Sequence, residues 1–154
     1  MTVIPLKQRD LFTKRWRKVE QRAKEVSFHI QLAAMLRWCI RPNVMWRHVP
    51  NGERRDPATA SKLKAMGVLP GSADLEFHWI EIDREYPHRM RRRLLHLELK
   101  AGNRPTSEAQ NFFALTVRLL GDDYRTARSI DEAVGILGEA GLIMKGVTVC
   151  GRRW

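Results

Sequence analysis

The stretch of sequence that decides the fold is Leu94-Leu95-His96-Leu97-Glu98-Leu99-Lys100. From Leu95 onward, leucine alternates with a polar or charged residue. Because successive side chains of a β-strand point to opposite faces, this alternation predicts a strand with one apolar face. The opposite face of that strand then carries His96, Glu98 and Lys100.

A second stretch, from Ala73 to Ile82, alternates in the same way. Each of its faces carries three side chains: Leu75, Phe77 and Trp79 on one, and Asp74, Glu76 and His78 on the other. The segment between the two stretches, Asp83 to Arg93, is charged and typical of a loop, so the two strands are expected to form an antiparallel hairpin. One face of the hairpin is then hydrophobic core, and the other gathers carboxylates, imidazoles and a lysine.

Further elements are expected on both sides of the hairpin. They are a helix from Glu25, a strand from Val44 to Val49, a short helix after Asp56 that ends at Gly67, a helix after Ser107 that ends at Gly121, a strand from Tyr124 to Ala127 and a helix after Ser129 through Glu139. Asp and Ser are favoured helix N-caps, and glycine commonly ends a helix. The order predicts one α/β domain over residues 25–154, with a mixed central sheet flanked by helices.

Two of these helices carry an apolar stripe, which indicates a face that packs on the core. In the first helix the stripe consists of Phe28, Leu32, Met35, Leu36 and Cys39; in the helix after Ser107 it consists of Phe112, Phe113, Thr116, Val117 and Leu120. The second helix also begins with a capping-box pattern, in which Gln110 follows Ser107 by three residues.

The chain of 154 residues has a net charge of +11, which favours a polyanionic partner. Its basic residues form clusters at Lys7–Lys24, Arg89–Arg93 and Arg152–Arg153. Each cluster taken alone is also compatible with a solvated surface. Together they favour nucleic acid, and we expect residues 1–24 to form a basic extension whose Arg15, Arg17 and Lys18 grip phosphates.

No apolar stretch is long enough for a membrane span, and the residues after Met1 lack the apolar core of a signal peptide. Cys39 and Cys150 lie far apart and do not have metal-ligand spacing. We therefore expect a cytoplasmic protein with reduced thiols and no membrane partner.

Asp74 and Glu98 are the first candidates for a functional site. Carboxylates held close together on a buried sheet face repel one another, and a divalent cation relieves that repulsion. Their oxygens suit Mg²⁺ or Mn²⁺, and Lys100 beside them could orient an attacking water or stabilise charge on a phosphate. The alternative is ordinary: a Glu-x-Lys pattern is often a solvent-facing strand with a cross-strand ion pair.

Glu25 is a third acidic candidate, because it extends the apolar stripe of the first helix by one turn, and a carboxylate on such a stripe is unusual. The alternative is that Glu25 only favours the helix dipole. Glu20 is a weaker candidate on the same element.

The order and spacing of several motifs resemble the VRR-NUC family, the virus-type replication-repair nucleases of the PD-(D/E)xK superfamily. The resemblance spans roughly residues 25–140, and the motifs that carry it are Arg47–Gly52, Lys62–Leu75, Leu97–Lys100, Ser107–Gln110 and Gly121–Arg125. Ala73 departs from the family, which usually has proline there. The resemblance implies a restriction-endonuclease-like core.

The resemblance also implies roles for individual residues. Asp74 and Glu98 would bind metal, the backbone carbonyl of Leu99 would be a further ligand, and Lys100 would be the catalytic lysine. The family has a glutamate on its first helix, which Glu25 matches best, although Gln31 or His29 could take part of that role.

Three more residues match family positions near the substrate: Gln110, His48 and Asn51. Capping of the helix by Gln110 and turn chemistry at Asn51 are the alternatives. His78 and His96 match no family position, and we expect them to be surface groups or supports of neighbouring ligands.

The expected function is a Mg²⁺- or Mn²⁺-dependent DNA endonuclease that prefers branched DNA, such as a Holliday junction or flap, in phage or bacterial repair. Homodimers are frequent among stand-alone members of the family. Two alternatives stay open: a non-catalytic DNA-binding module on a nuclease-like fold, and a sequence-specific restriction endonuclease.

Overall fold

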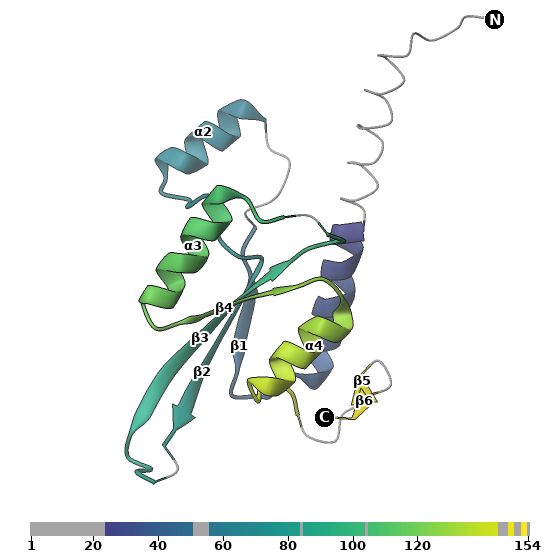
Figure 1. Ribbon diagram of the computed structural model, residues 1–154, viewed down its shortest axis with the longest axis vertical. Coiled ribbons are helices and arrows are strands. Elements are labelled where there is room, and N and C mark those ends of the chain that lie inside the picture. The colour runs from purple at the N-terminus through teal and green to yellow at the C-terminus, as the bar shows by residue number, and fades with distance from the viewer. Residues whose placement is uncertain are drawn as a thin grey trace, which may run out of the picture.

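The computed structural model describes residues 24–50, 56–83, 85–103, 105–144, 148–149 and 152–153. A helix over residues 24–39 comes first. It is followed by β1 (Met45–His48), α2 (Pro57–Ala65), β2 (Leu75–Ile82), β3 (Met90–Leu99), α3 (Glu108–Leu119), β4 (Asp123–Ala127), α4 (Ile130–Glu139), β5 (Thr148–Val149) and β6 (Arg152–Arg153) (Figure 1). Up to α4 this is the order that the sequence predicts.

Four strands form one mixed sheet in the order β1-β2-β3-β4. β1 pairs antiparallel with β2, β2 pairs antiparallel with β3, and β3 pairs parallel with β4. The predicted hairpin is therefore confirmed. β5 and β6 pair with each other in a separate two-stranded sheet.

The main core lies on the leucine face of the hairpin. The helix over residues 24–39 and α4 cover this face, on the opposite side of the sheet from α3 (Figure 1). The buried stripe of the first helix is confirmed, since Leu32 and Leu36 are fully buried and Phe28 and Cys39 nearly so. From α4, Ala133, Val134 and Leu137 pack against the same strands.

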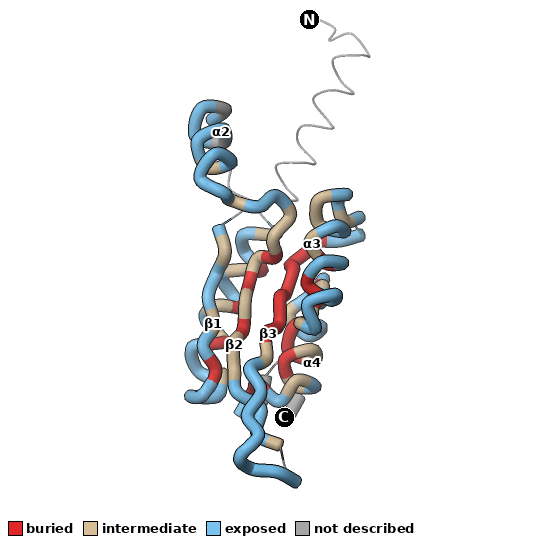
Figure 2. Tube along the Cα trace, turned by 90° about the vertical axis from the view of Figure 1, so that its left-hand side faces the viewer, coloured by how far each residue is buried: buried red, intermediate tan, exposed pale blue. Residues whose placement is uncertain are grey.

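The other face of the sheet is covered by α3, which encloses the polar side chains of the hairpin. Ala114 and Val117 of α3 form a small second core with Ala73 and Tyr124. Because this helix shields the sheet, His96, Glu98 and Lys100 are buried although they are polar. Figure 2 shows the resulting run of buried residues along β3.

The stripe predicted for α3 is partly wrong. Val117 is buried and Phe113 is half-buried, but Phe112, Thr116 and Leu120 are exposed. The apolar residues of this helix occupy more of its circumference than the face that touches the sheet. The outward face of α3 is consequently hydrophobic: Phe112, Leu115, Leu119 and Leu120 expose 72%, 55%, 79% and 75% of their surface.

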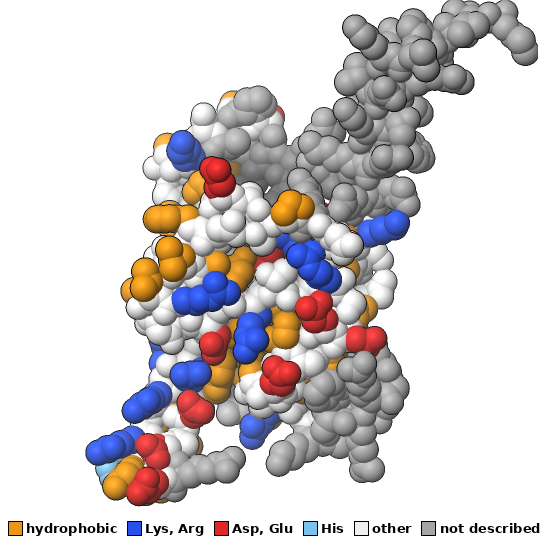
Figure 3. Space-filling model, viewed as in Figure 1, with side chains coloured by type: hydrophobic (Ala, Val, Ile, Leu, Met, Phe, Trp, Pro, Cys, Tyr) orange, Lys and Arg blue, Asp and Glu red, His pale blue; other side chains and the backbone are white. Residues whose placement is uncertain are grey.

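β3 begins at Met90, four residues earlier than the sequence predicts, so the charged loop is shorter than expected. Ile82 pairs with Met90, and the hairpin projects beyond the rest of the sheet (Figure 1). The arginines of this segment lie among acidic partners, as the mixed charges at the hairpin in Figure 3 illustrate. Arg93 contacts Glu81 at 3.6 Å and Asp123 at 3.3 Å. This basic cluster is thus partly neutralised.

The turn before β2 packs closely against the backbone of the first turn of α3. Gly71 has a φ of +82°, and a Cβ at this position would lie 2.4 Å from the carbonyl carbon of Ala109. A glycine is therefore required for the close approach. The contact fixes the first turn of α3 beside Asp74, which follows Gly71 by three residues.

None of the described helices is both long enough and apolar enough to cross a membrane. Of the basic extension predicted over residues 1–24, the structure describes Lys24 alone, which belongs to the helix over residues 24–39. Arg15, Arg17, Lys18 and Glu20 lie outside the described residues.

Candidate active site

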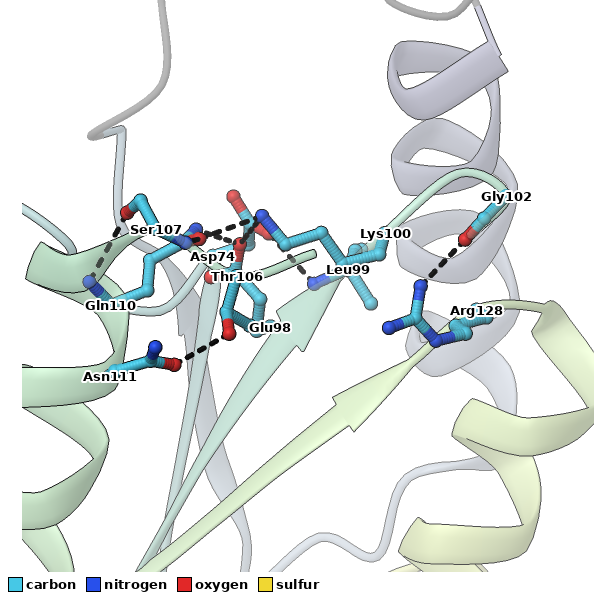
Figure 4. A network of polar contacts seen from close by, with 10 residues as sticks. All are labelled: Asp74, Glu98, Leu99, Lys100, Gly102, Thr106, Ser107, Gln110, Asn111 and Arg128. Carbon is cyan, nitrogen blue, oxygen red and sulfur yellow. Dashed lines mark hydrogen bonds and ion pairs between the residues drawn. The ribbon is translucent and has the colours of Figure 1, made fainter. Parts of the chain in front are cut away.

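Asp74, Glu98 and Lys100 meet where β3 ends and α3 begins (Figure 4). Asp74 directly precedes β2, Glu98 is the penultimate residue of β3, and Lys100 directly follows β3. Since Leu75 pairs with Leu97, the antiparallel register sets Asp74 beside Glu98 on the face that α3 covers. The structure thus brings together the two carboxylates and the lysine that the sequence predicts for one functional site.

One oxygen of Glu98 is held by two donors. Lys100 Nζ lies 3.0 Å from Glu98 Oε1, and Gln110 Nε2 donates a hydrogen bond to the same oxygen. Glu98 and Lys100 expose only 3% and 8% of their surface. An ion pair at that depth is far from the solvent-facing pair of the ordinary Glu-x-Lys strand, and it needs additional hydrogen bonds to offset the cost of burying two charges.

Gln110 provides those additional bonds. Its Oε1 accepts from Lys100 Nζ at 2.9 Å and from the backbone N–H of Ser107 at 2.9 Å. The expected capping box is therefore present, and the same side chain also binds both members of the ion pair. The two interpretations of Gln110 are combined in one residue: it caps α3 and holds Glu98 and Lys100.

The environment of Glu98 disfavours its ionised form. Burial raises the pKa of this carboxyl to about 7, and the nearby charges of Asp74 and Glu25 act in the same direction, against the lowering effect of Lys100. Perturbed carboxyl groups of this kind are frequent at functional sites, although buried ion-pair networks also produce them.

Asp74 is fixed by the backbone of β3. Its Oδ2 accepts a 2.8 Å hydrogen bond from the N–H of Leu99, which ties the start of β2 to the end of β3. In an extended strand the N–H and C=O of one residue point to the same side. The Leu99 carbonyl therefore faces the side of the strand on which Asp74 lies, while the Leu99 side chain is buried in the main core.

Of the candidates on the first helix, two lie near the site. Glu25 is close enough to act on the pKa of Glu98, and Asp74 acts on the pKa of His29, which burial and the neighbouring His48 lower. Glu25 and His29 are four residues apart and so share one face of the helix. Gln31 instead bonds to Ser27 at the exposed surface.

His48 lies at the end of β1 and contacts the ring of His29, with the two ring centroids 4.3 Å apart. It borders the site through His29 and does not join the Glu98 network. Asn51, the other residue of that predicted turn, lies outside the described residues.

The loop between Lys100 and α3 is anchored at both ends. Arg128 donates a 2.6 Å hydrogen bond to the carbonyl of Gly102, and Thr106 bonds to Asn111 at 2.5 Å (Figure 4). These bonds hold Lys100 and the first turn of α3 in a fixed relation.

A row of polar side chains crosses the sheet two residues along the strands from Asp74 and Glu98. Arg47, Glu76, His96 and Tyr124 are neighbours on β1, β2, β3 and β4. Arg47 donates to Glu76 at 2.8 Å, and His96 Nδ1 lies 3.5 Å from the same carboxylate. Although burial alone would raise the pKa of Glu76, the ion pair with Arg47 holds it below the usual value.

Tyr124 is the site residue that sequence reasoning missed. It is buried on β4, and its ring lies 6.2 Å from that of Phe113. Burial raises its pKa above the usual value, and so do the carboxylates of Glu98 and Asp74. Only the pairing of β4 with β3, which sets Tyr124 beside His96, shows that this tyrosine lies near the site.

The residues fit a divalent cation in one specific respect. Oε2 of Glu98 is buried and has no hydrogen-bond partner among the described residues, so a hard acceptor oxygen is available beside Asp74. Within the described ranges, no three His, Cys, Asp or Glu side chains are grouped closely enough to hold a metal ion together. The donor set that fits is therefore two carboxylates, Asp74 and Glu98, with the backbone carbonyl of Leu99; Glu25 as a ligand stays a prediction.

This sheet, its covering helices and the place of the site together define a restriction-endonuclease-like α/β fold. A solved structure named "VRR_NUC domain protein" matches 75% of this chain and 85% of its own, with a TM-score of 0.54 and 21% sequence identity. No family model matches the chain, and no curated protein matches it. The likeness confirms the predicted fold: the chain has a VRR-NUC-like α/β architecture.

Proposed function

We propose that this protein is a metal-dependent endonuclease that hydrolyses phosphodiester bonds in DNA. The observation that carries the proposal is the cluster at the end of β3 of buried Glu98 and Lys100 with half-buried Asp74. A fold that only binds DNA has no need for a buried glutamate and lysine beside a second carboxylate, because burying charged groups is costly.

Asp74, Glu98 and the Leu99 carbonyl would hold a Mg²⁺ or Mn²⁺ ion, with Glu25 as a further ligand from the first helix. When bound, such a cation polarises the phosphodiester and makes water a better nucleophile at neutral pH. Asp74 is held for this task by its bond to the Leu99 N–H. Glu98 is held through Oε1, which leaves Oε2 for the cation.

Lys100 assists the reaction with its remaining donor. Its ammonium group carries three hydrogens, and the described residues use two of them, at Glu98 Oε1 and Gln110 Oε1. The third is available for a non-bridging phosphate oxygen or for the attacking water. Hydrolysis forms a bond from the water oxygen to phosphorus and breaks one bridging P–O bond, and Lys100 stabilises the negative charge that develops.

The N-terminus of α3 adds to the attraction for phosphate. Its first backbone N–H groups and its dipole favour an anion at the position where Gln110 enters the network. Gln110 and His48 would contact the DNA at the site, and the net charge of +11 would draw the polyanion to the protein. Asn51, Arg15, Arg17 and Lys18 complete the proposed DNA contacts.

The substrate that we propose is branched DNA, a junction or a flap, as the family resemblance implies. Cleavage of two strands in one event favours two copies of the site related by a two-fold axis. We therefore also propose a homodimer.

The outward face of α3 is where the second copy would dock. Together with exposed Met66 and Leu69, the four exposed apolar side chains of α3 would form the surface that the second copy covers. Hydrophobic side chains gather over this helix and the turn after α2 (Figure 3). The charged residues of α3, Glu108 and Arg118, cancel each other and lie at opposite ends, so an antiparallel pair of α3 helices is self-complementary.

The test mixes the purified protein with labelled four-way junction, flap and linear duplex in Mg²⁺, in Mn²⁺ or in EDTA. We expect cleavage with either metal, fastest on a branched substrate, and none in EDTA. Binding of all three DNAs without cleavage in either metal, at any protein concentration, would instead identify a non-catalytic binding module. Cleavage at one short sequence in linear duplex would identify a sequence-specific endonuclease.

A further inference from the structure

Among the described residues, five buried side-chain atoms have no hydrogen-bond partner: His29 Nε2, His78 Nε2, His96 Nδ1, Glu98 Oε2 and Tyr124 Oη. Four of the five belong to the sheet face beneath α3, and the fifth, from His29, borders Asp74. Buried polar groups in native proteins nearly always have a partner. His78 Nε2 and His96 Nδ1 each lie 3.5 Å from an oxygen of Glu76, which leaves Glu98 Oε2 and Tyr124 Oη as the two atoms of this face with neither a hydrogen-bond nor an ion-pair partner among the described residues.

Tyr124 and Glu98 are complementary members of this group. The phenol is a hydrogen-bond donor that has no acceptor, and Oε2 is an acceptor that has no donor. Both side chains lie under α3, on adjacent parallel strands two residues apart in register. Ala73, which directly precedes Asp74, belongs to the same small core as the Tyr124 ring.

The pKa of the Tyr124 phenol depends on the charges of the site. Burial, Glu98 and Asp74 all raise the pKa of Tyr124, so the hydroxyl keeps its proton throughout the working pH range of a nuclease. Three groups near Glu98 are already engaged: Lys100 and Gln110 at Oε1, and Asp74 at the Leu99 N–H. On β4, Thr126 pairs directly with Glu98 and is half-buried, whereas the hydroxyl of Tyr124 is fully buried and has no partner among the described residues.

We propose that Tyr124 is a positioning residue of this site, whose hydroxyl donates through one bridging water to Oε2 of Glu98 and fixes the orientation of that carboxylate. The inference rests on the proposed function for the role of Glu98. A carboxylate oxygen has two lone pairs, so Oε2 can receive the water on one side and a cation on the other. Ligating carboxylates are generally held by such outer hydrogen bonds.

The first experiment measures single-turnover cleavage and DNA affinity for Tyr124→Phe. The chain has two tyrosines, so Tyr86→Phe, on the exposed hairpin turn, is a matched control. We expect Tyr124→Phe to cut about 10-fold more slowly or worse. Its dissociation constant for DNA should not change, and Tyr86→Phe should behave as the wild type. Equal rates for the two variants would overturn the proposal.

The second experiment needs no metal and no catalysis. Thermal melting in EDTA compares the effect of Tyr124→Phe in the wild type and in a Glu98→Met background. If the hydroxyl acts on Oε2, the substitution lowers the melting temperature of the wild type by several degrees and that of Glu98→Met by less than half as much. An equal decrease in both backgrounds would show that the hydroxyl acts elsewhere, and would overturn the proposal.

The two experiments separate this inference from the proposed function. If the wild type cuts no DNA in Mg²⁺ or Mn²⁺, the nuclease proposal fails, yet the melting comparison still decides the role of Tyr124. If Glu98→Met does not fold, the kinetic comparison of Tyr124→Phe with Tyr86→Phe decides it.

Discussion

The ionisation of Glu98 depends on side chains from several elements around the site. Lys100 and Gln110 bind one of its oxygens, while Asp74 and Glu25 place further negative charge nearby. The result is a buried carboxyl with a pKa of about 7, which takes up or releases its proton close to neutral pH. A cation bound at Oε2 would favour the ionised form, so metal and proton compete for this group.

This carboxyl makes a prediction about stability. Because its pKa is about 7 in the folded protein and ~4.3 in the unfolded chain, the folded state binds more protons between these values. The free energy of unfolding should therefore fall as the pH rises from about 4.5 to about 7, by up to ~3 kcal/mol. Glu98→Gln should remove this decrease.

Urea denaturation in EDTA at several pH values measures the effect. The control is Glu108→Gln, at an exposed position of α3, which should keep the pH dependence of the wild type. A Glu98→Gln variant with the same pH dependence as the wild type would show that the carboxyl is not protonated in the folded state near neutrality.

At the scale of elements, the geometry of the site depends on how the first turn of α3 packs against the turn at Gly71. The turn at Gly71 touches the backbone of Ala109, one residue before Gln110, so a displaced turn would move Gln110 away from Glu98 and Lys100. The capping box and the Gly71 contact act together, since both fix the first turn of this helix.

Gly71→Ala should consequently destabilise the protein by ~2 kcal/mol or more, because the positive φ and the steric overlap both oppose the new Cβ. It should also slow cleavage. Gly67→Ala is the matched control, since its φ of +86° is similar but its Cβ would meet open space. Chemical denaturation of both variants measures the difference, and equal losses would mean that the close approach to Ala109 is unimportant.

Particular elements show what the sequence could predict. The alternation in β3 and the stripe of the first helix were sufficient to place Glu98 and Lys100 on one face and the core on the other, because a buried face imposes a strict period. The stripe of α3 was partly wrong, since its apolar residues surround more of the helix than the sheet covers. Tyr124 was missed because its neighbours depend on a parallel pairing that leaves no local pattern.

At the scale of the whole molecule, the exposed face of α3 predicts a dimer. We expect the wild type to sediment as a dimer and the double substitution Leu115→Glu, Leu119→Glu to sediment as a monomer with unchanged helix content. Burying four added carboxylates at the interface is unfavourable, whereas each position is exposed in the single chain.

Trp38→Glu is the control for this experiment, because Trp38 is also exposed but lies on the helix over residues 24–39, away from α3. It should remain dimeric. Analytical ultracentrifugation at micromolar concentration decides the question, and a monomeric wild type would exclude the α3 interface.

In the proposed function, the ends of the hairpin strands supply Asp74 and Glu98, α3 shields them, and the net positive charge attracts DNA. The α/β architecture is shared with the solved VRR_NUC domain structure, while the proposed chemistry would depend on a few side chains. Among the proposed site residues, we expect the loss of Lys100 to separate cleavage from binding most clearly.

The most direct measurement is therefore the single-turnover rate of DNA cleavage by Lys100→Ala in Mn²⁺, with the affinity for the same DNA measured in parallel and Lys64→Ala on α2 as control. We predict a loss of about 100-fold or more in rate, because a buried ammonium group that stabilises developing charge is removed. DNA affinity should be retained, and Lys64→Ala should cut like the wild type. Cleavage by Lys100→Ala at the wild-type rate would contradict the account.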